Sequence, residues 1–543
     1  MLTIADRAAG PTLLLAIAIA CGGCVRSVPA RHALPTPQPV EDADEEREIA
    51  SPGDVQRWHD AARGAAPQSV RSAAYREFAR MNAALPAPRS TSSLDPLQWL
   101  SIGPQPLRDA AGRRFTGAVR SLAIDPRNAD VAYAGSASGG LWKTVDGGKT
   151  WTPLTDYRPS LWSGPVAISP LHPDTIYLAT GSVDHTGAGI LKSTDGGVSW
   201  TQLAGVFGGD AADYYGGTPI TAMAISPSDD RVLLAGVACC GATPAGLYRS
   251  ADGGLSWLPT GLKAPVGAVL FDPADPLAAY ATVSAQGLSV YKSSDQGVSW
   301  TAMTRSPRNA GGLAILSASP ARPKRLYLSI ADPSDGTLDG MYRSDDGGDN
   351  WAPLTAPVGF CGKWCWYNPF LAADPSTPDT VFAGGLHLFR STDAGKSWSN
   401  LTQDDRGDDT LHVDYHAAAF SADGARMYVA NDGGVFSSSD YARPAPTWTN
   451  LNATLGAVQF YNLSVDPTDA NHTLGDTQDL PGALYGGSRE WRSAAVCESG
   501  DSSIDPSNPN TAYVLCLGGG PLHESTRGGA PDSRAKQPMS GIG

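Results

Sequence analysis

The sequence predicts an all-β protein, a β-propeller made of four-stranded blades, and three observations lead to this fold. A short pattern, Ser/Thr-x-Asp-x-Gly-x-x-Trp, occurs six times, at intervals of about fifty residues, a period typical of propeller blades. Each repeat contains four short runs of β-branched and aromatic residues, bounded by Gly, Pro, Asp and Asn. No helical periodicity occurs between Ala118 and Cys516, which argues against an α/β fold.

The repeated pattern is predicted to close a β-hairpin rather than to carry catalysis. Its Asp and Ser side chains accept backbone N–H bonds and so complete a turn. Its Gly provides the positive φ of a tight turn, and its Trp buries a large apolar surface. Because an active site needs one or two such acids and the chain has six equivalent copies, we predict structural roles for them. These residues are Asp146, Asp195, Asp252, Asp295, Asp346 and Asp393.

The strands of each repeat are predicted in the order A, B, C and D, with the repeated pattern at the turn between C and D. In the first repeat they are the runs VRSLAIDP, VAYAGSAS, GLWKTVDGG and TWTPLTD. A seventh, eroded copy of the turn contains Asp440 and Trp448. Runs that resemble A strands begin near nine positions, which are Val119, Gly164, Ile220, Val266, Gly312, Phe370, Asp414, Gln459 and Ser502.

The number of blades stays open between two interpretations. In the first, seven blades form a propeller within residues 95–452, and residues 453–526 begin a second propeller that is cut short. In the second, the run LQWLSIGP from Leu97 supplies a missing D strand, and one ring of eight to nine blades closes. Closure into one ring would protect the sheet edges.

The repeats resemble Asp-box (BNR, sialidase-type) repeats. The chain is similar to the propellers of sialidases, tandem-propeller xyloglucanases and sortilin-like receptors, and most of all to large secreted bacterial proteins described as glycosyl-hydrolase-like or sortilin-like. The resemblance is carried by GGLWKTVDGGKTW, HVDYHAAAFSADGARMYVANDGGVF and VQFYNLSVDPTDANHTLGDTQD, within residues 95–520. The tandem propellers among these proteins favour a second propeller that is cut short. The resemblance is specific for fold and weak for function, because one fold hosts many activities.

The same resemblance permits a comparison with the enzymes residue by residue. Sialidases carry an Arg-Ile-Pro motif, which this sequence lacks. Xyloglucanases carry a catalytic Asp in a first-blade motif resembling Thr-Asp-x-Gly-Gly, where this chain has SASGG with Ala137 at the acid position. The seventh-blade motif NDGG keeps an acid, Asp432, at the equivalent place in its own repeat.

The N-terminal segment is predicted to direct export. Residues 1–24 contain an apolar run that is too short to span a bilayer as a mature helix and is typical of a signal peptide. Cys21, in AIAC, resembles a bacterial lipidation site. Residues 25–94 are predicted as a Pro-rich, acidic linker with short helices, and residues 527–543 as a disordered tail. The expected location is the periplasm, the outer membrane as a lipoprotein, or the outside of the cell.

Four cysteines are predicted to form two disulfides, as suits an exported protein. Cys361–Cys365 would close a short loop, and Cys497–Cys516 would join neighbouring strands. No metal site is predicted, since no CxxC pair recurs at zinc spacing, and no cofactor is expected. A nucleic-acid partner is not expected either, because the net charge of −14 opposes contact with phosphates.

The ligand site is predicted on the face formed by the B–C and D–A loops, opposite the turns between C and D. Aromatic and acidic residues gather in these loops, and glycoside hydrolysis needs two carboxylates about 5–10 Å apart. An alternative interpretation is that the tryptophans fill the gap between blades five and six. The residues predicted to contact the ligand are Tyr214, Tyr215, Trp364, Trp366, Tyr367, His412 and His416.

The segment HVDYH concentrates chemical groups. On a strand, His412, Asp414 and His416 would point to one face, and two imidazoles with a carboxylate can bind a metal. A lone strand seldom completes such a site, so a buried hydrogen-bond network that includes Asp432 is favoured. Asp414 and Asp432 are the predicted catalytic acids if the chain is an enzyme.

Two functions are therefore predicted from the sequence. The first is a non-catalytic module, exported to the cell surface, that binds a carbohydrate or a protein or peptide. The loss of the acid at Ala137 favours this function. The alternative is a glycoside hydrolase that resembles xyloglucanases or sialidases and acts on a polysaccharide. The sequence leaves open whether the chain is an enzyme, and membrane contact is expected only through the predicted lipid anchor.

Overall fold

The computed structural model describes residues 101–530, apart from a set of short gaps. The predicted signal peptide, its Cys21, the linker, the C-terminal tail and the run at Leu97 lie outside the described residues. No helix in the described part of the chain is long and apolar enough to cross a membrane. The gaps are 159, 183–186, 204–206, 208–217, 239–242, 286, 308–310, 368, 403–410 and 518–521.

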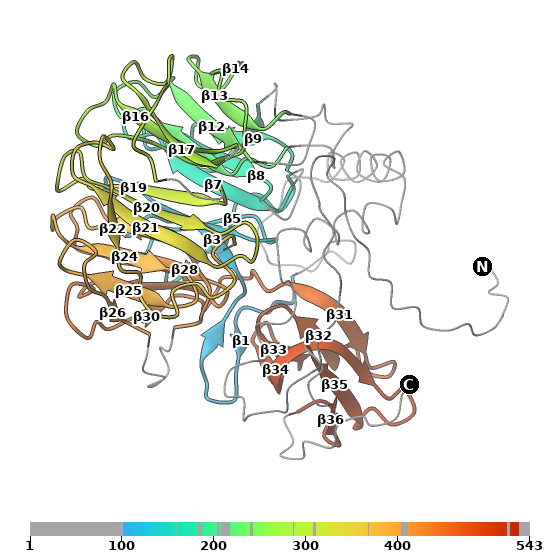
Figure 1. The fold of residues 1–543 in the computed structure, drawn as a ribbon. Coiled ribbons are helices and arrows are strands. Elements are labelled where there is room, and N and C mark those ends of the chain that lie inside the picture. Colours follow the sequence, from blue (N-terminus) through green and yellow to red (C-terminus); the bar gives the residue numbers. More distant parts are fainter. Residues whose placement is uncertain are drawn as a thin grey trace, which may run out of the picture.

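Seven four-stranded antiparallel sheets form the blades of a β-propeller, which is the larger body in Figure 1. Each blade uses four strands that are consecutive in the sequence. The first four blades are β3 (Val119–Ile124), β4 (Ala132–Ser136), β5 (Leu141–Thr144) and β6 (Thr152–Pro153); β7 (Ser163–Ile168), β8 (Ile176–Thr180), β9 (Ile190–Ser193) and β10 (Thr201–Gln202); β11 (Ala222–Ile225), β12 (Leu233–Val237), β13 (Gly246–Ser250) and β14 (Leu258–Pro259); β15 (Val266–Phe271), β16 (Ala279–Ser284), β17 (Leu288–Ser293) and β18 (Thr301–Ala302).

The remaining three blades follow the same order. They are β19 (Ala314–Ala318), β20 (Leu326–Ala331), β21 (Leu338–Ser344) and β22 (Ala352–Leu354); β23 (Phe370–Ala373), β24 (Val381–Gly384), β25 (Leu388–Ser391) and β26 (Ser399–Asn400); β27 (Tyr415–Phe420), β28 (Met427–Asn431), β29 (Gly434–Ser438) and β30 (Thr449–Asn450).

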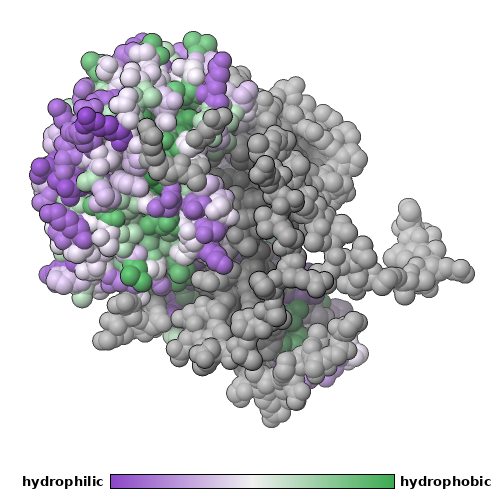
Figure 2. Space-filling view, in the orientation of Figure 1, coloured by the Kyte–Doolittle hydropathy of each residue, from purple (hydrophilic) through white to green (hydrophobic). Residues whose placement is uncertain are grey.

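Burial within a blade follows the position of the strand. The second strand of each blade is buried along its whole length, apart from the last residue of β16, whereas the fourth strand has no buried residue. A strand covered on both faces by neighbouring blades reads as a continuous apolar run, which is why these B strands carry Tyr, Leu, Ile, Val and Ala. The rim of the propeller that Figure 2 shows at the left is largely hydrophilic.

The propeller closes between its first and seventh blades. Tyr428 Oη donates a hydrogen bond of 2.9 Å to the Ala129 carbonyl, and Arg426 forms an ion pair of 2.7 Å with Asp130. Trp151 Nε1 donates to the Leu451 carbonyl at 2.8 Å. Because blade seven contains β27 to β30 alone, side-chain contacts rather than a shared sheet close the ring.

Of the two interpretations of the blade number, seven blades in the propeller is confirmed. The alternative, one ring of eight to nine blades, is wrong, because seven blades already close. The rest of the chain forms a separate body, here called the C-terminal unit, which lies below the propeller in Figure 1. It is one eight-stranded sheet. Its strands are β1 (Leu107–Arg108), β2 (Arg114–Phe115), β31 (Phe460–Val465), β32 (Thr473–Thr477), β33 (Pro481–Tyr485), β34 (Trp491–Ile504), β35 (Ala512–Cys516) and β36 (Leu522–Ser525).

One long strand organises the C-terminal unit. The 14 residues of β34 pair first with β33 and then with β35, so that one strand ends an eighth blade and begins a ninth. The short strand β1 pairs parallel with β34, with Leu107 opposite Trp491. The segment that precedes the propeller therefore adds to the C-terminal unit and not to the ring.

The six repeated aspartates lie in the turns between the third and fourth strands. In the second blade, Asp195 accepts hydrogen bonds from the backbone N–H and hydroxyl of Ser199, at 2.8 and 2.5 Å. Ser193 donates to Asp195 and accepts the N–H of Gly197, both at 2.8 Å. A Cβ on Gly197 would lie 2.7 Å from a methyl carbon of Leu154 in the preceding blade, and its φ of 93° favours glycine as well. Each of the six turns has this pattern.

We expect Asp195→Asn to reduce stability at neutral pH and to have no effect in strong acid. The hydrogen bonds from Ser199 lower the pKa of Asp195 to about 2, below the value of about 3.9 in an unfolded chain. A carboxyl whose pKa is lower in the folded chain than in the unfolded chain stabilises the fold above the unfolded pKa. This contribution disappears as the pH falls from about 4 to about 2. Thermal unfolding of wild type and variant across this range measures the difference.

The matched control for this variant is Val198→Ala, since Val198 is 84% exposed in the same turn. Its effect on the melting temperature should be small at every pH. If Asp195→Asn lowers the melting temperature as much at pH 2 as at neutral pH, the stability does not come from the ionised Asp195 carboxylate.

Candidate functional site

Residues 360–367 form an aromatic loop before the sixth blade, and half of these residues are buried in the propeller. Phe360, Cys361, Cys365 and Trp366 are all buried, and they belong to the apolar core between blades five and six. The structure contains the Cys361–Cys365 disulfide. Trp366 thus fills the gap between these blades, as the alternative interpretation held.

Trp364 and Tyr367 form the exposed side of this aromatic group. Both are partly buried and pack against the same core. The rings of Trp364 and Trp366 have centroids 6.1 Å apart, and those of Trp364 and Tyr367 are 6.4 Å apart. Of the three aromatic residues predicted in this loop, Trp364 and Tyr367 are the two with more than a marginal exposed surface.

Tyr367 connects the loop to the first and seventh blades. Arg120, on β3, donates a hydrogen bond of 2.6 Å to the Tyr367 hydroxyl, and its guanidinium lies 4.8 Å from the ring centroid. The Tyr367 ring meets the His416 ring edge-on at 5.2 Å. Residues from the first blade, the seventh blade and the loop before the sixth blade therefore meet beside the first strands of these blades.

His416 and Asp432 form a buried pair at this place. His416 Nε2 lies 2.6 Å from Asp432 Oδ1, and the two side chains are 4% and 3% exposed. Asp414 directly precedes Tyr415, Asp432 directly follows Asn431, and Tyr415 and Asn431 are paired across β27 and β28. The two acids predicted to be catalytic therefore start from neighbouring backbone positions, and one of them is bonded to a histidine.

The predicted alternation of His412, Asp414 and His416 along one strand is wrong. The strand β27 begins only at Tyr415, and Asp414 has a φ of 61°, so the chain turns before the strand starts. His412 Nε2 instead lies 3.0 Å from the carbonyl of Asp479 in the C-terminal unit. His412 thus contacts the C-terminal unit, whereas His416 contacts Asp432 within the propeller.

Other predicted residues fall in two groups. Tyr214 and Tyr215 lie outside the described residues. Ala137, at the position where the resemblance implies an acid, is 2% exposed, and its N–H donates to the Ala118 carbonyl at 2.9 Å. A longer side chain at this position would have to displace its neighbours.

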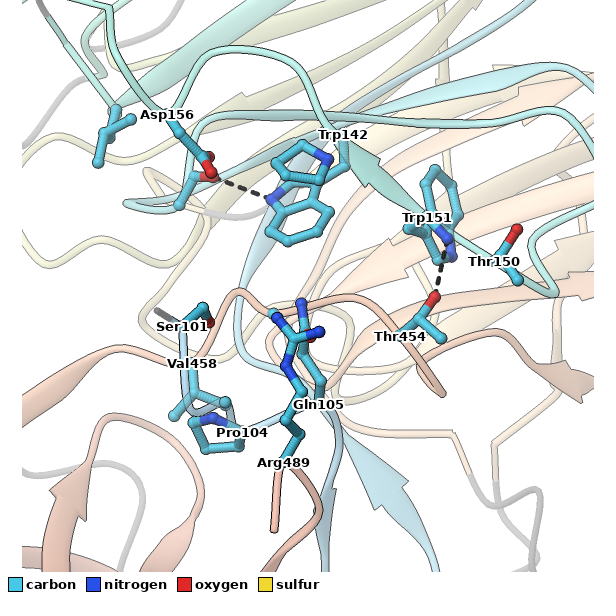
Figure 3. A pocket seen from close by; sticks show the side chains of 15 residues that line it. Ser101, Pro104, Gln105, Trp142, Thr150, Trp151, Asp156, Thr454, Val458 and Arg489 are labelled. Carbon is cyan, nitrogen blue, oxygen red and sulfur yellow. Dashed lines mark hydrogen bonds between the residues drawn. The ribbon is translucent and has the colours of Figure 1, made fainter. Parts of the chain in front are cut away.

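A pocket of about 640 Å³, which no pattern in the sequence predicts, lies between the propeller and the C-terminal unit. Trp142 and Asp156 line it from the first blade, and Gln105 and Arg489 point into it from the opposite side (Figure 3). Desolvation by the surrounding protein raises the pKa of the Asp156 carboxyl. The walls of the pocket come from segments that are far apart in the sequence, and no local sequence pattern connects these segments.

The C-terminal unit holds the second disulfide. Cys497 and Cys516 are bonded, and ligand atoms of these two residues and His523 lie within 4.8 Å of one another. A thiolate, and not a disulfide sulfur, is the form of cysteine that binds metals. In the oxidised state this group is therefore a covalent link between β34 and β35.

Comparisons with known proteins agree with this architecture. No family model matches the chain. A xyloglucanase of a Paenibacillus species is 26% identical in an alignment of 366 residues that covers 60% of this chain and 34% of that protein. A xyloglucanase of Hypocrea jecorina is 27% identical in an alignment of 334 residues that covers 52% of this chain and 38% of that protein. The chain thus spans well under half of the length of these relatives.

Solved structures of GH74 enzymes share the fold. The Niastella koreensis GH74 enzyme has a TM-score of 0.59 at 19% identity, over 79% of this chain and 68% of that one. An ancestral GH74 enzyme has a TM-score of 0.57 at 18% identity, over 78% and 61%. At such identities the likeness concerns architecture alone. The chain therefore has the β-propeller fold of GH74 enzymes, and its sequence relatives include xyloglucanases.

Proposed function

We propose that this chain acts on a polysaccharide as a glycoside hydrolase of the xyloglucanase type. The observation that carries the proposal is sequence similarity to curated xyloglucanases over more than half of the chain. The six aspartate turns support an assignment to the Asp-box (BNR) repeats. Export by residues 1–24, with lipidation at Cys21, would bring the chain to such a substrate, and its two disulfides suit an oxidising compartment.

The candidate reaction centre is the pair Asp414 and Asp432. A glycosidase needs two carboxylates, one on either side of the scissile bond. Asp414 and Asp432 lie directly beyond Tyr415 and Asn431, which are paired at one end of the hairpin of β27 and β28. His416 holds Asp432 in place, so Asp414 is the acid assigned to contact with the sugar. Trp364 and Tyr367 supply flat rings nearby, which suit the faces of sugar rings.

A second candidate is a polysaccharide-binding protein without hydrolysis. Two observations favour it. Asp432 is only 3% exposed and engaged by His416, and the first-blade acid position holds the buried Ala137. In this case Trp364 and Tyr367 serve binding alone.

The test uses the whole chain with xyloglucan. Released reducing ends measure hydrolysis, and calorimetric titration measures binding. For a hydrolase, Asp414→Asn is expected to lower the rate by about 100-fold or more, the contribution typical of a general acid or base. The matched control is Asp423→Asn, an exposed acid in the turn between β27 and β28 at the other end of the hairpin.

The possible outcomes separate the two candidates. Hydrolysis that falls in Asp414→Asn and persists in Asp423→Asn supports the hydrolase. Binding without released reducing ends, weakened by Tyr367→Ala, supports the binding protein. A chain that neither binds nor cleaves xyloglucan or related β-glucans rules out both.

A further inference from the structure

Three side chains of the C-terminal unit that can bind a metal ion have ligand atoms within 4.8 Å of one another. They are Cys497 on β34, Cys516 on β35 and His523 on β36, three neighbouring strands of one sheet. Cys516 is paired with Ser499, two residues after Cys497. His523 is paired with Val514, two residues before Cys516. Because residues two apart on a strand point to the same face, the register brings the three groups to one face of the sheet.

This face of the ninth blade packs against the eighth blade. Val514, on the same face of β35 as Cys516, shares a core with Leu474 on the second strand of the eighth blade. Cys497 packs against the same core. Cys516 is only 4% exposed, whereas Cys497 and His523 are partly buried. The group therefore lies between two blades of the unit, and two of its members remain accessible to an ion from solvent.

The imidazole of His523 points at the two sulfurs without another role. It has no hydrogen-bond partner among the described residues, whereas the imidazoles of His416 and His472 are each bonded to an aspartate. The sulfurs of a disulfide offer it little, because sulfur is a weak acceptor. A metal ion held by the same sulfurs would use the ring nitrogen fully.

We propose that Cys497, Cys516 and His523 bind a Zn²⁺ ion when the disulfide between the two cysteines is reduced. A dithiol reductant breaks the S–S bond, each cysteine sulfur gains a proton, and the reductant becomes a disulfide. Both thiols then lose their protons to solvent as the ion binds, because the thiolate is the form that ligates a metal. Two thiolates and an imidazole are ligands that Zn²⁺ prefers, and a water molecule completes the tetrahedron.

The backbone is already arranged for both states. The Cα atoms of Cys497 and Cys516 are 5.7 Å apart. Two sulfurs that each lie about 2.3 Å from one tetrahedral ion are about 3.8 Å from each other. Rotation of the two cysteine side chains provides this separation, so the strands keep their register when the ion replaces the S–S bond.

The two states exclude each other, since each sulfur forms either the S–S bond or a bond to the ion. The disulfide joins β34 to β35 alone, whereas the ion also joins β36 through His523. An ion that binds the folded chain stabilises it. Zn²⁺ should therefore raise the melting temperature of the reduced chain and leave that of the oxidised chain unchanged.

The test needs a protein in which no thiols outside the described residues can bind the ion. This background protein is the full chain with Cys21→Ser, Cys24→Ser, Cys239→Ser and Cys240→Ser. The second disulfide stays in place. Cys361 and Cys365 are both 1% exposed, and within the described part of the chain they belong to no group of three ligand residues.

Titration with Co²⁺, whose absorption reports its ligands, tests the site. The reduced background protein, separated from its reductant in the absence of air, is expected to bind Co²⁺ and to show thiolate-to-cobalt charge transfer. Zn²⁺ should displace the cobalt and remove this absorption. The oxidised protein should show no such absorption, and its melting temperature should not respond to Zn²⁺.

His523→Ala separates the metal site from the disulfide, because it removes one ligand and leaves both cysteines. It should lower the affinity of the reduced protein for Zn²⁺ by about 100-fold or more, since even the loss of a group that supports a ligand costs about 10–100-fold. The matched control is Glu524→Gln, the next residue on β36, which is paired with Tyr513 and points to the opposite face. Its affinity should equal that of the background protein.

Two results would overturn the proposal. One is a reduced background protein that shows no thiolate absorption with Co²⁺, including the case in which it binds Cu⁺ but neither Co²⁺ nor Zn²⁺. The other is His523→Ala that binds Zn²⁺ as tightly as Glu524→Gln does. His523→Asn repeats the comparison if His523→Ala alters the circular dichroism spectrum.

Discussion

Replacing Trp151 with alanine is expected to lower the free energy of unfolding of the propeller by about 3–5 kcal/mol, the usual cost of removing a buried tryptophan. Trp151 is 5% exposed and belongs to the core that joins the first and seventh blades. Its indole N–H donates to the Leu451 carbonyl, and its backbone N–H donates to the Thr454 hydroxyl at 2.8 Å. The variant loses buried area and also leaves the Leu451 carbonyl without this donor, which adds a desolvation cost.

Trp200→Ala is the matched control, since Trp200 occupies the same place in the second blade and is 7% exposed. Its indole N–H bonds to Gly197 within its own turn, so its loss leaves the closing interface intact. Denaturant unfolding should show a larger loss for Trp151→Ala than for Trp200→Ala. Equal losses would mean that the closing interface is no more sensitive than any other.

Trp491→Ala is expected to destabilise the C-terminal unit by a similar amount, about 3–5 kcal/mol, and to affect the propeller little. Trp491 is 2% exposed and donates from Nε1 to the Ile102 carbonyl at 2.9 Å. Its ring lies 5.4 Å from Phe460 and 5.1 Å from Tyr485. It therefore connects β34, β31 and β33 with the segment that precedes β1.

Hydrogen exchange followed by mass spectrometry measures this effect for each body separately. Faster exchange should be confined to β31–β36 and β1, while the blades of the propeller keep their wild-type rates. Trp200→Ala should give the reverse pattern. Uniformly faster exchange in Trp491→Ala would show that the two bodies unfold together.

The blades could be predicted from the sequence because their signals are local. The aspartate, glycine and tryptophan of each turn lie within nine residues, and they act on one another within the same hairpin. The number of blades in the ring could not be predicted, since closure depends on contacts such as Arg426 with Asp130, nearly three hundred positions apart. The segment before the propeller was ambiguous for the same reason, because its partner β34 is distant in the sequence.

The site was harder to predict than the fold. The sequence predicts a hydrogen-bond network that includes Asp432, and within it the structure pairs Asp432 with His416. The orientation of His412 was not predicted, because the left-handed backbone of Asp414 ends the alternation that a strand would impose. Trp366 shows a further limit: an aromatic residue in a loop can belong to the core when two blades leave a gap beside it.

Each four-stranded sheet of the propeller is complete within one stretch of sequence, which has a consequence for how such chains change length over evolutionary time. In-frame duplication or loss of one repeat adds or removes an entire sheet, and no strand of a neighbouring blade loses its backbone partner. Only the side-chain contacts between the new neighbouring blades must then form anew. Insertion or loss of one repeat of the propeller therefore leaves the backbone hydrogen bonds of every other blade intact.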